Sequence, residues 1–258
     1  MQGNVHIFDA PDALLDALVR HWQKIAEASI ADHGAFHVAL AGGGTPRQLY
    51  ARLTQTDVKD SVAWDRVHLY FGDERCVPPE HEDSNYRMAR ETLFSRLPIP
   101  ASQIHPMYSP ERTPEQNATV YARLLEQQLA KDADGNPVFD LVLLGMGEDG
   151  HTASLFPDTE ILDEHKRPVA AQFVDRLGVW RISLTYPTLN AARHVAMLVV
   201  GATKAGILAD IARLPADEVR YPVQGVKPAG DLQWFLDRAA ARLLTDDVAD
   251  NSADDAHP

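Results

Sequence analysis

The sequence predicts an α/β protein of three layers, α/β/α, with a mostly parallel sheet between two layers of helices. Short apolar runs alternate along the chain with segments whose apolar residues recur every three or four positions, the patterns of strands and amphipathic helices. The runs at 139–144 and 195–200 are almost entirely apolar, which is typical of strands buried on both faces. Strands that alternate with helices form right-handed crossovers and therefore a parallel, Rossmann-like sheet.

Each element follows from its own pattern. The first is a helix over 11–31, where apolar residues at steps of three and four leave one face to pack on the sheet. Apolar runs, most of them with a glycine nearby, predict strands at 36–41, 67–71, 139–144, 179–184 and 195–200. Helical periodicity predicts further helices at 46–53, 84–97, 114–131, 203–214 and 232–244.

Length and composition favour one compact domain. The chain has 258 residues, of which 45% are hydrophobic and 24% charged, the proportions of an ordinary globular protein. We expect a single α/β domain over residues 1–244. The last residues, 245–258, contain five aspartates and few apolar side chains, so they are predicted to form an acidic, disordered tail.

Charge and cysteine content exclude several classes of partner. Lysine and arginine number 24 and aspartate and glutamate 37, so the net charge is 24 − 37 = −13, which argues against nucleic-acid binding. Cys76 is the only cysteine and cannot form an internal disulfide, which fits the cytoplasm. The sequence starts without a signal-peptide pattern and has no apolar stretch of about 18 residues, so no membrane contact is expected.

Metal, cofactor and covalent chemistry are not predicted. His33 and His37 have the spacing of helical metal ligands, but Gly34 lies between them at a helix-to-strand join, so the two are not expected to share a face. No Gly-x-Gly-x-x-Gly follows the first predicted strand, so a nicotinamide cofactor is not expected. No Gly-x-Ser-x-Gly motif occurs, and Cys76 has no histidine next to it in the sequence.

The candidate site lies where the predicted strands end, because ligands of open α/β sheets bind beyond the carboxyl ends of the strands. The first strand runs into Gly42, Gly43, Gly44 and Thr45, then a helix. We expect Thr45 to be the N-cap residue and Pro46 the first helical residue. Free N–H groups at such a helix start suit a phosphate, although the glycines alone are equally compatible with a tight turn.

Charged residues follow two other strands. Asp73 and Arg75 come directly after the strand at 67–71, where Arg75 could hold a phosphate and Asp73 could orient a water molecule or a sugar hydroxyl. A helix cap with a surface ion pair is the competing interpretation. Lys204 lies in the first turn of a predicted helix, which an anion at that place would explain, although a snorkelling surface lysine is the competing interpretation. Arg181, in the strand at 179–184, either points into the site or is an edge-strand charge.

His151 is the candidate general base. It follows the strand at 139–144 in the glycine-rich segment GMGEDGH, and histidine is the side chain whose ordinary pKa lies nearest neutrality. Asp149, two residues earlier, is expected either to orient His151 or to accept hydrogen bonds from its own turn.

Several segments together resemble the 6-phosphogluconolactonase family. They are LAGGGTPRQLY at 40–50, FGDERCVP at 71–78, SNYRMARETL at 84–93, FDLVLLGMGEDGHTASLFP at 139–157, LTYPTLNAARHV at 184–195 and GATKA at 201–205. The resemblance implies the fold shared with glucosamine-6-phosphate deaminase and ribose-5-phosphate isomerase. It also implies hydrolysis of 6-phosphoglucono-1,5-lactone to 6-phosphogluconate in the oxidative pentose phosphate pathway, without a cofactor or metal.

The same resemblance implies roles for particular residues. The family's base matches His151, and its phosphate site resembles Gly43, Gly44 and Thr45 with Arg75 and Lys204. Asp73, Asn85 and Arg181 also fall on motif positions. Gly44 stands where many relatives have serine, which removes one hydroxyl donor to phosphate.

Two other functions fit the sequence less well. An aminosugar-phosphate isomerase or deaminase would carry Ala-Phe-Asn-Glu-Pro after the histidine, whereas this chain has TASLFP at 152–157 and lacks that glutamate. A non-catalytic sugar-phosphate sensor would need an output module, and no basic helix-turn-helix segment is visible. The expected partner is a small sugar-phosphate lactone, bound by a monomer or small homo-oligomer.

Overall fold

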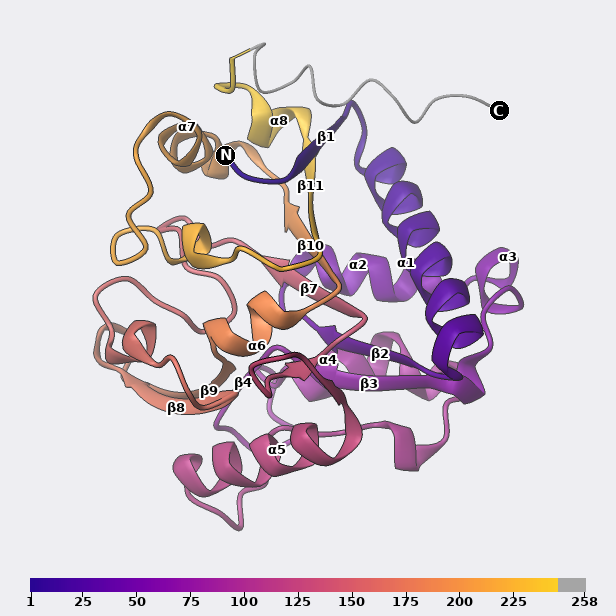
Figure 1. Cartoon of the computed structure of the whole chain (residues 1–258). Helices are drawn as coiled ribbons and strands as arrows, with labels where there is room; N and C mark the ends of the chain where they lie inside the picture. The colour runs from indigo at the N-terminus through magenta and orange to yellow at the C-terminus, as the bar shows by residue number, and fades with distance from the viewer. Residues whose placement is uncertain (246–258) are drawn as a thin grey trace.

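The computed structural model describes residues 1–245 and contains a six-stranded central sheet (Figure 1). Every pair of neighbouring strands in this sheet is parallel. Helices lie on both sides of the sheet, so the predicted three-layer α/β/α class is confirmed. In spatial order the strands are β1 (Asn4–Phe8), β11 (Asp231–Asp237), β10 (His194–Val199), β7 (Leu141–Gly145), β2 (Phe36–Leu40) and β3 (Val67–Phe71).

The helix α1 (Pro11–His33) shows how the apolar pattern becomes packing. Its buried side chains include Leu14, Leu18 and Trp22, which recur at steps of four and contribute to the hydrophobic core. The helix ends at Gly34, whose φ is 85° and whose N–H donates to the carbonyl of Ile30. The other helices are α2 (Gly44–Leu53), α3 (Thr56–Lys59), α4 (Asn85–Thr92), α5 (Pro114–Gln128), α6 (Tyr186–Ala191), α7 (Ala205–Arg213) and α8 (Arg238–Ala241).

A second, antiparallel sheet corrects the prediction for residues 179–184. That segment is indeed a strand, β9 (Val179–Leu184), but it pairs with β8 (Val169–Val174) and β4 (Asp73–Arg75) and not with the central sheet. These three strands lie at the lower left of Figure 1. Asp73 and Arg75, which were expected only to follow the strand at 67–71, themselves form β4 and pair with β9, with Arg75 opposite Arg181.

The prediction of a helix at 232–244 is wrong. Residues 231–237 form the strand β11, which pairs with β1 on one side and β10 on the other, and only the short α8 follows it. Leu232, Trp234 and Leu236 alternate along this strand, but Phe235 between them makes the run nearly continuous, and a short apolar run cannot be assigned to a strand or a helix by periodicity alone. The partner strand β1 was not predicted at all, although Val5 and Ile7 alternate with polar residues.

Three other predicted helices end or begin elsewhere than expected. The helix predicted at 84–97 ends at Thr92, and a 3₁₀ turn follows at Phe94–Arg96. The helix predicted to 131 ends at Gln128, because the chain then forms the hairpin of β5 (Ala130–Lys131) and β6 (Pro137–Val138). The segment predicted as a helix from 203 begins with a 3₁₀ turn, Ala202–Lys204.

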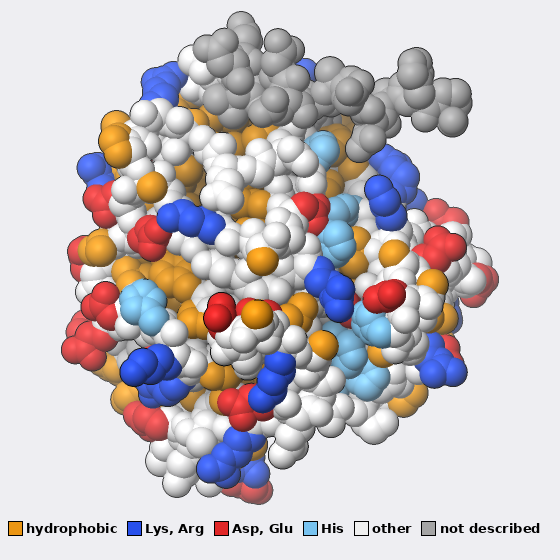
Figure 2. Space-filling model, in the orientation of Figure 1, with side chains coloured by type: hydrophobic (Ala, Val, Ile, Leu, Met, Phe, Trp, Pro, Cys, Tyr) orange, Lys and Arg blue, Asp and Glu red, His pale blue; other side chains and the backbone are white. Residues whose placement is uncertain are grey.

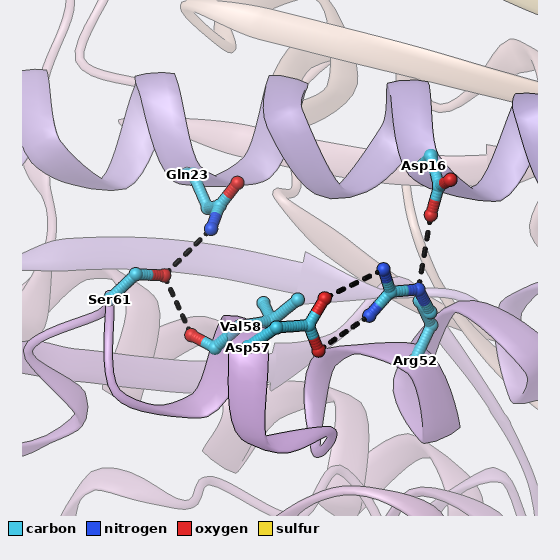
Figure 3. A network of polar contacts seen from close by, with 6 residues as sticks. All are labelled: Asp16, Gln23, Arg52, Asp57, Val58 and Ser61. Carbon is cyan, nitrogen blue, oxygen red and sulfur yellow. Dashed lines mark hydrogen bonds and ion pairs between the residues drawn. The ribbon is translucent and has the colours of Figure 1, made fainter.

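Polar contacts join the first helices on the outside of the molecule (Figure 3). The Arg52 guanidinium donates from Nε to Asp16 of α1 over 3.0 Å and from both Nη atoms to Asp57 of α3 over 3.0 and 2.9 Å. Gln23 of α1 donates to Ser61 Oγ over 2.6 Å, and Ser61 donates to the carbonyl of Val58. The planar fork of one arginine therefore connects α1, α2 and α3.

Histidines form a row at the amino ends of β2 and β3. His33 is the last residue of α1 and His37 lies in β2, so the chain has the predicted helix-to-strand join at Gly34, yet the two rings stack with centroids 6.3 Å apart. His37 is 4.7 Å from His68, which stacks on His105. Burial lowers the pKa of His37 and of His105 to about 4. Figure 2 shows several histidine side chains reaching the face drawn there.

Two further predictions concern the C-terminal tail and membrane-spanning segments. The predicted acidic tail, 245–258, lies outside the described residues apart from Thr245. Among residues 1–245 no helix is both long and apolar enough to cross a membrane.

Candidate active site

A cavity of about 260 Å³ opens at the carboxyl ends of β2, β3 and β7. Segments far apart in the sequence meet there, as expected for the rim of a parallel sheet. Of the predicted site residues, Gly43, Asp73, Arg75, His151 and Lys204 line the cavity. Gly44, Thr45, Asn85, Asp149 and Arg181 are not in its lining.

The carboxylate of Asp149 forms a hydrogen bond with the imidazole ring of His151. His151 Nδ1 is 2.5 Å from Asp149 Oδ1, which also accepts the backbone N–H of His151 over 3.2 Å. Because an ionised carboxylate only accepts, Nδ1 carries the hydrogen of this contact, and Nε2 is the ring nitrogen left to exchange a proton with another molecule. Burial raises the pKa of Asp149, but the hydrogen bonds from His151 and Arg176 outweigh it and hold that pKa below its usual range.

The turn around His151 has room only for glycine at residue 147. A Cβ atom at Gly147 would collide with the imidazole of His151 and with Asp149 Oδ1. The Gly147 N–H donates to the carbonyl of His151 over 2.8 Å, so the turn closes tightly upon the histidine. The glycine-rich sequence therefore serves the close approach of the backbone to the His151–Asp149 pair.

Asp73 is fixed by two neighbours on other elements. Its carboxylate accepts from Asn85 Nδ2 over 3.1 Å and from Ser154 Oγ over 2.7 Å. Asn85 is buried, and a Cβ atom at Gly42 would collide with its side-chain amide. Asn85 thus acts through Asp73, and the glycine loop leaves the space that Asn85 fills.

Arg75 and Arg181 lie opposite each other on β4 and β9. Arg75 Nη1 donates to the carbonyl of Asp83 over 2.6 Å, but the Nε atoms of both arginines are buried without a partner among the described residues. Burial, and then the charge of Arg75, lower the pKa of Arg181. Two adjacent guanidiniums with unused donors are suited to an anion.

The glycine loop differs in detail from the prediction. The N-cap residue of α2 is Gly43, with φ at 103°, and the helix begins at Gly44, so Thr45 and Pro46 lie inside its first turn. The prediction of Thr45 as N-cap is therefore wrong, because the chain turns two residues earlier. Lys204 closes the 3₁₀ turn before α7 and reaches the same cavity.

Glu74 was not predicted to have any role, yet it anchors α4. Its buried carboxylate accepts the backbone N–H groups of Arg75, Asn85 and Tyr86, each over 2.8 Å, and the Ser84 hydroxyl over 3.3 Å. Burial raises the pKa of Glu74 to about 7, although the three N–H donors act in the opposite direction. Through these bonds Glu74 positions both Arg75 and Asn85.

Replacing Glu74 by alanine is expected to lower the free energy of unfolding by about 3 kcal/mol, because several buried donors lose their acceptor. The loss should be larger at pH 5 than at pH 8. The folded-state pKa, about 7, lies above the ordinary 4.5, so the wild type loses stability between these values as pH rises and the variant does not. Urea unfolding at both pH values measures this, with the exposed Glu80→Ala as control. Equal stability of Glu74→Ala and wild type would contradict it.

The sequence also predicted no role for Ser154 or Arg176. Their contacts bridge 81 and 27 residues of sequence, to Asp73 and Asp149 respectively, so no local pattern marks them. Within residues 1–245 no three histidine, cysteine, aspartate or glutamate side chains gather so that they could hold a metal ion.

Known proteins resemble this chain over most of its length. The family model described as glucosamine-6-phosphate isomerases/6-phosphogluconolactonase matches residues 9–234. The 6-phosphogluconolactonase of Synechocystis sp. is 41% identical over 228 residues, which cover 88% of this chain and 92% of that protein. The solved structure of 6-phosphogluconolactonase from Trypanosoma brucei superposes with a TM-score of 0.81 at 31% identity, covering 95% of this chain and 99% of the other.

A more distant structure shares the fold alone. It is a monomeric glucosamine-6-phosphate deaminase, with a TM-score of 0.77 at 17% identity over 93% of this chain and 99% of that one. The extent of the family match and the identity to Synechocystis place the sequence: the chain belongs to the family of glucosamine-6-phosphate isomerases and 6-phosphogluconolactonases.

Proposed function

We propose that this protein hydrolyses 6-phosphoglucono-1,5-lactone to 6-phosphogluconate. The observation that carries the proposal is one cavity in which an imidazole braced by a carboxylate shares the lining with the cationic Arg75 and Lys204. A lactone phosphate needs both, a base for the ester and cations for the phosphate. The substrate class is supported by relatives that are named 6-phosphogluconolactonase.

His151 is the base in this proposal. Nδ1–H donates to Asp149, so Nε2 accepts a proton from a water molecule whose oxygen attacks the lactone carbonyl carbon. The carbonyl π electrons move to oxygen and form a tetrahedral intermediate. When the carbonyl re-forms, the bond from the carbon to the ring oxygen breaks, and the imidazolium returns its proton to that oxygen as a hydroxyl. The product is the open-chain acid, formed without a covalent bond to the protein.

The phosphate lies at the other end of the substrate. Arg75 and Lys204 supply charge, and the N–H groups at the start of α2 supply donors near Gly43. Arg181 reinforces Arg75 from the neighbouring strand. Asp73, oriented by Asn85 and Ser154, is left to accept from a sugar hydroxyl or a water molecule.

An assay with the lactone made in situ tests the proposal. Glucose-6-phosphate dehydrogenase and its oxidised cofactor generate the lactone, and its disappearance is followed with and without this protein at one pH. We expect faster loss of lactone than by spontaneous hydrolysis. No acceleration would refute the proposal, and ammonia release from glucosamine 6-phosphate would favour a deaminase instead.

Replacing Gly147 by alanine is expected to lower kcat at least about 10-fold, since small misplacements of reacting groups cost rate steeply. The new methyl group would push His151 away from Asp149. Steady-state lactone hydrolysis measures the effect. Gly206→Ala is a matched control, because a Cβ there meets nothing within 4 Å. Unchanged kcat in Gly147→Ala would show that the described turn is not the catalytic one.

A further inference from the structure

Arg176 reaches the His151–Asp149 pair from the second sheet. It lies in the turn Asp175–Leu177 between β8 and β9, and its guanidinium forms an ion pair with Asp149 Oδ2. The other oxygen, Oδ1, contacts the ring and the backbone N–H of His151. Each oxygen of Asp149 thus has its own cationic or N–H partner, which fixes the plane of the carboxylate.

The ring of Phe156 contacts both Arg176 and His151. The Arg176 guanidinium carbon is 4.8 Å from the centroid of the Phe156 ring, and the His151 ring centroid is 4.3 Å from the same ring. Phe156 is buried, with 4% of its surface exposed, so it offers a rigid platform. A planar guanidinium can stack on this platform and pair with Asp149 at once.

The charges around His151 give Arg176 an electrostatic effect as well. Asp149 contacts the ring directly, and the cavity lining adds Asp73, Arg75 and Lys204. Tyr221 packs against Gly150 and donates its hydroxyl hydrogen to Asp210. Arg176 is the cation paired with Asp149, so it offsets the carboxylate charge that would otherwise hold a proton on the imidazole.

We propose that Arg176 is a positioning residue for the reaction of His151: it orients Asp149 and keeps the imidazole available as a base near neutral pH. This inference rests on the proposed function. A surface ion pair without such a role would only tether the β8–β9 turn, and its loss would leave the pH dependence of activity unchanged.

Two variants separate orientation from charge. Arg176→Gln removes both, and we expect kcat to fall about 10-fold and the acid-side midpoint of the kcat/KM profile to rise by about half a pH unit. Arg176→Lys keeps the charge but lacks the planar fork, so the midpoint should stay near the wild-type value while kcat recovers only in part. KM should change little in either variant, since Arg176 is not in the cavity lining.

A measurement without substrate keeps this test independent of the proposed function. NMR titration of the His151 ring should show its midpoint moving to higher pH in Arg176→Gln and not in Arg176→Lys, whatever the substrate is. Arg167→Gln is the matched control, because Arg167 is exposed and pairs with Glu164 over 2.5 Å. Absence of lactonase activity in the wild type would refute the function alone. An unmoved ring titration, or equal kcat losses in Gln and Lys variants without a pH change, would overturn the role of Arg176.

Discussion

Replacing His151 by alanine is expected to lower kcat for lactone hydrolysis by about 10²–10⁴-fold, the usual contribution of a general base. The substrate should still bind, because the groups proposed to hold the phosphate belong to other segments of the chain. KM is therefore expected to remain within a few-fold of wild type. Rates at saturating lactone, corrected for spontaneous hydrolysis, measure the effect.

A second histidine variant provides the control. His165 is exposed and lies outside the cavity lining, so His165→Ala should retain full activity. Thermal unfolding of His151→Ala distinguishes lost chemistry from lost structure, since its side chain is 30% exposed and the fold should tolerate truncation. Full kcat in a folded His151→Ala protein would remove His151 from the mechanism.

Replacing Arg75 or Lys204 by alanine is expected to raise KM by about 10- to 100-fold, because each removes a charge-assisted hydrogen bond of roughly 1.5–3 kcal/mol from the phosphate. The phosphate is remote from the reacting carbon, so kcat should fall much less than in His151→Ala. Initial rates over a range of lactone concentrations separate the two constants. Inorganic phosphate should inhibit the wild type and inhibit both variants more weakly.

Two substitutions serve as controls for the predicted phosphate site. Arg75→Lys keeps the cation and should lose less affinity than Arg75→Ala, which also loses the hydrogen bond to the carbonyl of Asp83. Lys166→Ala removes an exposed lysine and should have no effect on KM. If KM were unchanged in both Arg75→Ala and Lys204→Ala, the proposed phosphate site would be wrong.

Four of the six strands of the central sheet could be predicted because their apolar patterns are unmistakable. The runs that became β2, β3, β7 and β10 are almost wholly apolar, and their ends are marked by glycine or charge. The segment 232–244 failed for the opposite reason: its apolar spacing suits a helix and a strand equally, and pairing with both β1 and β10 decided the outcome. Only tertiary contacts supply that information.

Some residues of the candidate site could likewise be predicted from the sequence and others could not. His151, Arg75 and Lys204 follow elements whose carboxyl ends must meet at one rim, so a general rule places them together. Glu74 and Arg176 act through hydrogen bonds and ion pairs between separate elements, and β4 and β9 had not been recognised as partners. Their roles depend on the second sheet, β4-β9-β8, which the sequence pattern does not predict.

The close approach of Gly42 to Asn85 restricts how this protein can evolve. A methyl group at residue 42 and the amide at residue 85 would occupy the same space, so residue 42 cannot gain a side chain while Asn85 stays as it is. Lineages that acquire alanine or serine at 42 should first have lost the bulk of the asparagine, and with it the support that it gives to Asp73. The two sites are therefore expected to show epistasis, because the effect of a substitution at residue 42 depends on which residue stands at 85.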